Sequence, residues 1–378
     1  MSYVFGWKTE SSVFISCDTA LTSSKKEGNL RFSKTSFGEN HIFNEDMRIT
    51  EEMLKIFQLS NNILIGFAGD NDVAFDTVNN IKILLQFRES NIDSLIEIIK
   101  QSTENCVPED NDSSIGLIVG FSDSNNSYLL SYNFDGTRRI LVHDDTVQIG
   151  SISNEFKILT KKFIEAFVNH PLPDSELLIT INSIVQSYGI HDYLIKQGVG
   201  GIITGAMLNV HGILWQRDTT HLLYNSIDLS KKVVNNTAPP PKVVNIDNLS
   251  PQVVNIIMRD GAIVSQDMYE QKRIYGNIFN TPDFDLWYKR HLNNNPEIFN
   301  NKKPKYFVFY MIDSWNITIL CGTNKIKNSK YFNVSNWGGG EFYITISQLL
   351  MDKLLKKKQK SKDVFKSLTI NRILDEEQ

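Results

Sequence analysis

Three polar residues near the start of the chain could together carry out a nucleophilic reaction. Ser2 follows the initiator methionine, Asp18 lies sixteen residues further on, and Lys55 precedes an apolar run. A serine hydroxyl is a weak nucleophile that needs a nearby base. If Met1 is removed, the new amine of Ser2, with an ordinary pKa of about 7.7–8.0, can accept that proton. An ammonium such as that of Lys55 favours the neutral amine by repulsion, and Asp18 would hold the lysine in place.

Each of these residues also has an ordinary structural interpretation. Serine is common after an initiator methionine, Asp18 could simply end a strand, and Lys55 could lie on an exposed helix face. Ser151, which precedes a predicted helix, could be the N-cap of that helix. Lys34, sixteen residues after Asp18, is a rival for the lysine. We prefer Lys55, since the apolar run 63–69 follows it closely.

Common catalytic and phosphate-binding signatures do not occur in the sequence. It contains no GxSxG elbow, no GxxxxGK[ST] loop and no HExxH motif. The seven histidines are scattered, with no pair at metal-ligand spacing in an obvious site. The glycine-rich stretch 198–201 precedes a predicted strand rather than a helix, so it indicates a close-packed turn. We therefore expect no metal and no cofactor.

The composition is that of an ordinary globular protein. Hydrophobic residues make up 41% and charged residues 22% of the chain, and the formal net charge of −4 argues against a general nucleic-acid binder. No run approaches the roughly 18 apolar residues of a membrane span, and Lys8 and Glu10 interrupt any signal peptide. The three widely spaced cysteines fit a reducing compartment. We expect a cytoplasmic protein with no membrane or nucleic-acid partner.

Apolar periodicity predicts alternating blocks of strands and helices in the first 224 residues. Strands are expected at 3–7, 13–17, 62–67, 115–121, 128–132, 139–142, 147–149, 202–210, 213–216 and 221–224. Helices are expected at 73–85, 92–99, 156–167 and 174–184, the last with Asp174 as its N-cap. Such blocks suggest layers with sheets in the middle and helices outside. A three-layer αβα arrangement is the alternative that periodicity leaves open.

The composition changes after residue 224, which predicts a second part of the chain. A proline-containing linker is expected at 229–260, between a first domain at 2–228 and a C-terminal domain of unknown function at 261–378. Strands are expected at 306–311 and 316–321, and the segment 342–355 should begin as a strand and continue as a helix. The basic amphipathic stretch 349–360 could bind a membrane or an acidic partner, but a solvated helix end is the preferred interpretation.

The order of the polar residues in the first domain resembles that of proteasome β-subunits and the related bacterial HslV peptidase. In that family the chain opens with threonine and continues through strand, turn and strand to an aspartate. A lysine then precedes a strand ending in Ala-Gly, and a Gly-Ser-Gly turn comes later. The matching positions in residues 2–226 are Ser2, Asp18, Lys55, Ala68-Gly69 and Gly150-Ser151.

The resemblance implies a fold and a set of roles for the matching residues. The fold would be the α+β four-layer αββα sandwich of the N-terminal-nucleophile (Ntn) hydrolases, followed here by a smaller α/β appendage. The backbone N–H of Gly69 would form the oxyanion hole, and Ser151 would orient the amine of the nucleophile. Substrate-binding positions would be Ala20, Thr22 and Phe67, with Phe67 lining the pocket beside the scissile bond.

The sequence also departs from the family pattern. Serine replaces the commoner threonine, and Ile152 stands where the second glycine of the Gly-Ser-Gly turn is expected. Lys196 and Val199 occupy the places where the family often has an acidic residue and a serine before a late Gly-Gly pair.

Three functions are therefore weighed. The leading one is a peptidase acting on peptides or proteins as a homo-oligomer, with a ring as one form and the C-terminal domain as a site for a partner protein. The alternatives are a non-catalytic proteasome-like scaffold and a small-molecule amidase of the same superfamily.

Overall fold

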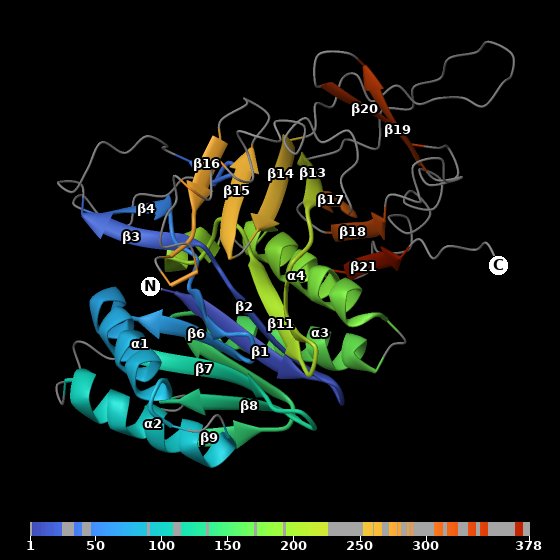
Figure 1. Cartoon of the computed structure of the whole chain (residues 1–378). Helices are drawn as coiled ribbons and strands as arrows, with labels where there is room; N and C mark the ends of the chain where they lie inside the picture. The colour runs from blue at the N-terminus through green and yellow to red at the C-terminus, as the bar shows by residue number, and fades with distance from the viewer. Residues whose placement is uncertain are drawn as a thin grey trace, which may run out of the picture. The chain divides into compact units, whose positions relative to one another are not determined.

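Figure 1 shows a computed structural model of the whole chain. The chain forms two compact units. The structure describes residues 2–24, 34–39, 47–88, 91–108, 115–133, 136–169, 172–191, 194–225, 252–259, 261–266, 272–277, 279–280, 286, 289, 306–312, 316–323, 332–337, 341–346 and 367–372. Unit 1 consists of Met1–Gln216, Met258–Val264 and Arg273–Phe284. Unit 2 consists of Arg217–Ile257, Ser265–Lys272 and Asp285–Gln378. Unit 1 thus ends its first segment before residue 228, the predicted boundary, and takes in two later segments.

Two five-stranded antiparallel sheets form the centre of unit 1. The first has the order β10-β1-β2-β11-β12, with β1 (Tyr3–Lys8), β2 (Ser12–Cys17), β10 (Thr146–Gly150), β11 (Thr204–Asn209) and β12 (Gly212–Trp215). The second has the order β5-β6-β7-β8-β9, with β5 (Ile56–Ser60), β6 (Ile63–Gly69), β7 (Ile115–Ser122), β8 (Ser127–Tyr132) and β9 (Ile140–His143). A separate pair consists of β3 (Ala20–Ser24) and β4 (Met47–Glu51).

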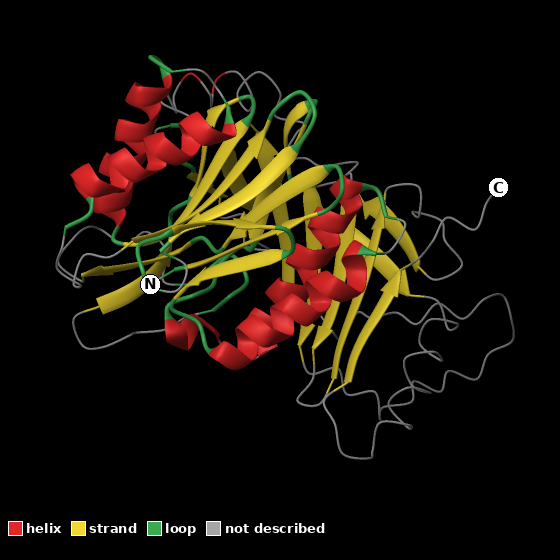
Figure 2. Ribbon diagram, turned by 90° about the horizontal axis from the view of Figure 1, so that it is seen from below, coloured by secondary structure: helices red, strands yellow, loops and turns green. Residues whose placement is uncertain are grey.

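Two pairs of helices pack on these sheets, one pair on each (Figure 2). The helices are α1 (Asn71–Leu85), α2 (Ile92–Cys106), α3 (Asn154–Val168) and α4 (Asp174–His191). The side chains of Asp70, Asn91 and Ser153 cap α1, α2 and α3 by accepting bonds from backbone N–H groups of the first turn. Apolar residues of α1 and α2 form one core with β5–β8, and those of α3 and α4 form another with β1, β2 and β11.

The inner faces of the two sheets touch because small residues leave room at their contact. A Cβ atom added to Gly66 would lie 2.7 Å from Val4 and 2.8 Å from Ile15 of the other sheet. A Cβ on Gly120 would lie 3.1 Å from Val13. The period-2 alternation of β2 explains this packing, since Val13 and Ile15 point to one face and Phe14 to the other.

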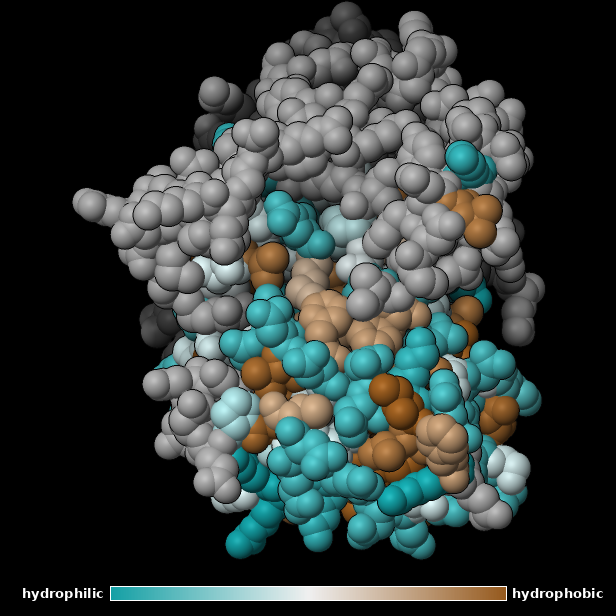
Figure 3. Space-filling view, turned by 60° about the vertical axis from the view of Figure 1, so that its left-hand side comes forward, coloured by the Kyte–Doolittle hydropathy of each residue, from teal (hydrophilic) through white to brown (hydrophobic). Residues whose placement is uncertain are grey.

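The predicted mixture of helices and strands is confirmed: the described residues form four α-helices and several antiparallel sheets. The prediction of Ser151 as a helix N-cap is wrong, because α3 begins two residues later and Ser153 supplies the capping oxygen. Strands β3, β4 and β5 were not predicted; β3 and β4 lie in or after the polar stretch 19–40 and carry few apolar residues. On the face of the molecule in Figure 3, apolar side chains lie among hydrophilic ones.

The chain after residue 216 forms a further sheet with the order β16-β15-β14-β13-β17-β18-β21. Its strands are β13 (Thr219–Asn225), β14 (Gln252–Arg259), β15 (Ala262–Gln266), β16 (Lys272–Tyr275), β17 (Tyr306–Ile312), β18 (Asn316–Thr323) and β21 (Ser367–Arg372). Strand β14 occupies part of the predicted linker 229–260. Strand β19 (Phe332–Trp337) pairs antiparallel with β20 (Glu341–Ile346). The predicted helix within 349–360 lies outside the described residues.

None of the helices among the described residues is long and apolar enough to cross a membrane.

Candidate active site

The first two strands of the chain bring Ser2 next to Asp18. Strand β1 begins directly after Ser2, and β2 ends directly before Asp18. Because Val4 pairs with Cys17 in the antiparallel register, Tyr3 lies beside Asp18. The backbone N–H of Tyr3 donates to Oδ1 of Asp18 at 2.9 Å, and the N–H of Asp18 donates to the carbonyl of Tyr3 at 3.1 Å. The carboxylate is therefore held one residue away from Ser2.

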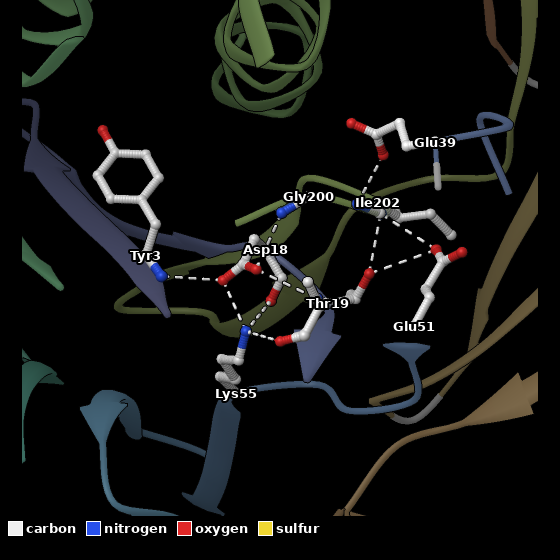
Figure 4. A network of polar contacts seen from close by, with 10 residues as sticks. Tyr3, Asp18, Thr19, Glu39, Glu51, Lys55, Gly200 and Ile202 are labelled. Atoms are coloured by element: carbon white, nitrogen blue, oxygen red, sulfur yellow. Dashed lines mark hydrogen bonds and ion pairs between the residues drawn. The ribbon is translucent and has the colours of Figure 1, made fainter. Parts of the chain in front are cut away.

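A buried ion pair joins Asp18 to Lys55, and both side chains are fully inaccessible to solvent. The ammonium Nζ of Lys55 lies 2.7 Å from Oδ1 of Asp18 and also donates to the carbonyl of Ala20 at 2.5 Å (Figure 4). A charge is buried in a protein core only when it is paired and hydrogen-bonded, because its desolvation is costly. Lys55 immediately precedes β5, so the edge of the second sheet sets the position of its backbone.

Backbone donors surround the other carboxylate oxygen of Asp18. Oδ2 accepts from the N–H of Ala20 at 3.1 Å and from the N–H of Gly200 at 3.3 Å. The carboxylate therefore contacts three backbone N–H groups and the ammonium of Lys55. These protein groups alone fix the orientation of the Asp18 carboxylate.

The structure places Ser151 against the backbone of Ser2. The N–H of Ser151 donates to the carbonyl of Ser2 at 3.0 Å. Gly150 makes this approach possible: its φ is +110°, and an added Cβ would lie 1.9 Å from the carbonyl oxygen of Ser2. The side chain of Ser151 is exposed, whereas Ser2 is only 3% exposed. The orienting role of Ser151 stays a prediction.

The other predicted residues occupy different surroundings. Gly69 ends β6 with φ +121° and is exposed. Ala20 is buried against Lys55 and Asp18, and Thr22, in β3, is partly buried. Phe67 has no exposed surface, and its ring stacks on Phe57 at a centroid distance of 5.2 Å in the core below α1 and α2. The oxyanion and substrate-binding roles of these residues stay predictions.

Of the two lysines considered, Lys55 is the one that the structure brings to Asp18. Lys34 is described and lies exposed, whereas Lys55 is fully buried in the ion pair. Cys17 is a neighbouring nucleophile by residue type. Burial raises the pKa of its thiol to about 12, so the thiolate is disfavoured at neutral pH and Cys17 is no rival to Ser2.

Two glutamates that the sequence did not single out extend the polar network beside Asp18. Glu51 is 5% exposed; its Oε1 accepts from the N–H of Ile202 at 3.1 Å and from the hydroxyl of Tyr275 at 3.0 Å. Glu39 accepts from the N–H of Gly201 at 2.9 Å. Burial raises the pKa of Glu39 to about 7, and the negative charges of Glu51 and Asp18 act in the same direction.

The turn 200–202 donates three successive backbone N–H groups to three different carboxylates. Gly200 donates to Asp18, Gly201 to Glu39 and Ile202 to Glu51 (Figure 4). The glycines make the close approach possible: Gly201 has φ +71°, and a Cβ there would lie 2.6 Å from Oγ1 of Thr19. The predicted close-packed turn is confirmed.

Two of the departures from the family pattern, Lys196 and Val199, lie close to this turn in the sequence. Lys196 is exposed and Val199 is fully buried, so neither supplies the acidic or hydroxyl group that the resemblance implies. Glu39 and Glu51 instead bring carboxylates to the turn, from the segment 34–39 and from β4 respectively. Only the position of Glu51, four residues before Lys55, could have pointed to a role from the sequence.

Among the described residues, no group of three or more His, Cys, Asp or Glu side chains is arranged to hold a metal ion. The carboxylates of Asp18, Glu39 and Glu51 are engaged instead with backbone donors and Lys55.

No family model matches the chain, and no curated protein matches it.

Proposed function

We propose that this chain is an Ntn amidohydrolase, most closely a proteasome-like peptidase that uses Ser2 after removal of Met1. The observation that carries the proposal is the fully buried Lys55–Asp18 ion pair, bonded to the backbone of the residue that follows Ser2. A buried ion pair is costly and contributes little to stability by itself. A requirement for an ammonium beside the N-terminal residue accounts for it.

The architecture of unit 1 supports this proposal. Its two sheets pack face to face through Gly66 and Gly120, and a helix pair lies on the outer face of each. We interpret this arrangement as the four-layer αββα sandwich of the Ntn hydrolases. Ser2 then lies directly before β1 and Asp18 directly after β2, at the position where that fold carries its nucleophile.

The chemistry follows from the free amine. Removal of Met1 converts the amide nitrogen of Ser2 into an amine that takes the proton from Oγ as Oγ attacks a substrate carbonyl. Lys55 keeps that amine neutral by repulsion, and the N–H of Gly69 stabilises the oxyanion. The proton passes to the leaving amine when the C–N bond breaks, which leaves an ester on Ser2. Water hydrolyses that ester and restores the hydroxyl.

The same proposal includes the class of substrate and partner. The substrate would be a peptide or protein in the cytoplasm, without a cofactor. The protein would assemble as a homo-oligomer, with a ring as one form, and the C-terminal part would receive a partner protein.

A non-catalytic scaffold is the second candidate, and two observations favour it. Ser2 is only 3% exposed, and Lys196 and Val199 stand where catalytic relatives often carry an acid and a serine. A scaffold would keep the fold and the ion pair but would not react with a substrate.

Labelling with an electrophile separates the two candidates. A peptide epoxyketone or vinyl sulfone should label the wild type and Ser124→Ala, which alters an exposed serine in a turn, equally. Ser2→Ala should lose the label. Equal labelling of Ser2→Ala and wild type would remove Ser2 as the nucleophile, and an unlabelled wild type would favour the scaffold.

A further inference from the structure

A segment from late in the chain packs against the edge strand that follows Lys55. We call the described residues Tyr275, Asn277, Phe279 and Asn280 the strap; they belong to unit 1. Asn277 is 4% exposed, and its Nδ2 donates to two carbonyl groups, that of Leu54 at 3.1 Å and that of Ile56 at 2.7 Å. These carbonyl groups belong to the residues immediately before and after Lys55.

A second asparagine continues the same pairing along β5. Asn280 donates through Nδ2 to the carbonyl of Ile56 at 2.9 Å and accepts through Oδ1 from the N–H of Gln58 at 2.8 Å. Strand β5 is the edge strand of its sheet. It pairs with β6 on one side, and the two asparagines bond to its other side. The two amide side chains therefore satisfy backbone groups that a neighbouring strand would otherwise pair.

The strap is anchored on both sides of the asparagines. The hydroxyl of Tyr275 donates to Oε1 of Glu51 at 3.0 Å, which links the strap to the carboxylate that accepts from Ile202 in the turn 200–202. The ring of Phe279 packs edge-on against Phe57 at a centroid distance of 5.0 Å and stacks on Phe75 at 5.9 Å. Polar and apolar contacts thus fix the strap against the segment 51–57.

We propose that Asn277 is a positioning residue for Lys55, and that the strap is part of the candidate active site although it lies more than 200 residues after that lysine. Asn277 bonds the carbonyl groups of both residues that flank Lys55. It therefore sets the position of the Lys55 backbone, from which the side chain extends. The contacts of the ammonium with Asp18 at 2.7 Å and with the carbonyl of Ala20 at 2.5 Å depend on that backbone position. A displacement of about 1 Å at a catalytic group can cost on the order of 100-fold in rate.

The positional part of this inference is independent of the activity, whereas its effect on reactivity rests on the proposed function. If Asn277 had a purely structural role, its substitution would change stability but not the reactivity of Ser2. A positioning role requires that its loss change the environment of the Ser2 amine, because a displaced Lys55 no longer repels the protonated form of that amine.

The experiment compares Asn277→Asp with Asn133→Asp in the full chain. Both changes replace an amide that donates to a backbone carbonyl by an isosteric group that cannot donate when ionised, and Asn133 bonds to Ile115 at 2.9 Å at the end of β8. Asn277→Ala is the second variant, in case the added charge prevents folding. Hydrogen exchange of the peptide 51–60 and the pH profile of labelling at Ser2 are measured for each protein.

We expect Asn277→Asp and Asn277→Ala to speed exchange in 51–60 at least tenfold, with peptides 3–8 and 12–17 unchanged. The labelling profile should move to higher pH, toward the ordinary amine pKa of about 7.7–8.0. Asn133→Asp should change neither readout. Unchanged exchange in 51–60 would overturn the inference, as would labelling that falls by the same factor at every pH. If the wild type is not labelled, the proposed function fails, and exchange in 51–60 then tests only whether Asn277 holds the backbone on both sides of Lys55.

Discussion

The side chain of Lys55 is buried with its charge paired, an arrangement that is by itself a weak source of stability. Its ammonium has no exposed surface and is held by Asp18 and the carbonyl of Ala20. Replacing a buried ion pair by apolar residues is often neutral or stabilising, whereas removing one partner is costly. We therefore propose a role for the pair beyond stability.

Breaking the pair from one side should be strongly destabilising. We expect Lys55→Met to lower the free energy of unfolding by about 3 kcal/mol, because the carboxylate of Asp18 stays buried without its counter-charge. The double variant Lys55→Met, Asp18→Asn should recover part of that loss. Denaturant unfolding of the two single variants and the double variant measures the coupling. Additive losses would show that the two residues do not stabilise each other.

Glu39 should make stability depend on pH. Its pKa is raised in the folded state from 4.5 to about 7, so the native state binds a proton that the unfolded state has released between these values. Stability is then lost as pH rises through that window, by about 3 kcal/mol at most.

Glu39→Gln removes this titration, so the variant should gain stability relative to wild type between pH 5 and pH 8. Urea unfolding at the two pH values tests the sign. A difference between the two proteins that does not change with pH, or that shrinks as pH rises, would contradict the assignment.

At the scale of elements, the junction between β10 and α3 determines how closely Ser151 approaches Ser2. Gly150→Ala should destabilise the protein by more than the roughly 1–2 kcal/mol of a left-handed backbone, because its Cβ would also overlap the carbonyl of Ser2. Gly136→Ala is the matched control, with φ +78° and no atom within 4 Å of the added Cβ.

Thermal unfolding and Ser2 labelling should separate the two glycine variants. Gly136→Ala should lose stability only, whereas Gly150→Ala should also slow labelling. Equal effects of both variants on labelling would mean that the contact between Ser151 and Ser2 does not matter for reactivity.

The sequence predicted most elements of unit 1 because their apolar residues repeat with the period of a strand or a helix. The segments around β1, β2, β6 and α1–α4 all show this periodicity. It could not predict β3 and β4, whose polar residues carry no such signal. The candidate residues Ser2, Asp18 and Lys55 were found from their types and spacing. Asn277 and Glu39 could not be found in this way, because their roles depend on contacts with residues far away in the sequence.

At the scale of the whole molecule, the strap belongs to unit 1 although a long segment of unit 2 precedes it in the sequence. Predicted domains of 2–228 and 261–378 treat the chain as two consecutive pieces, whereas residues 258–264 and 273–284 group with the first unit. Periodicity reports local structure only, so it cannot show a segment returning to an earlier unit. A candidate site that includes Asn277 therefore needs residues from both sides of the proline-containing stretch.

The proposed function also predicts self-association. The full chain should form a defined homo-oligomer, and Ser2→Ala should form the same one, because assembly through unit 1 does not need the hydroxyl. Native mass spectrometry over a range of concentrations measures the subunit number. A protein that stays monomeric throughout would contradict the proposed assembly and leave the chemistry at Ser2 to be judged separately.

The identity of the N-terminal residue tests the central claim most directly. Intact mass and peptide mapping of the epoxyketone-treated full-length protein give both the first residue and the site of the adduct. The account predicts that the chain begins at Ser2 and that the adduct is on that residue. Quantitative retention of Met1, or an adduct on any other residue, would contradict it.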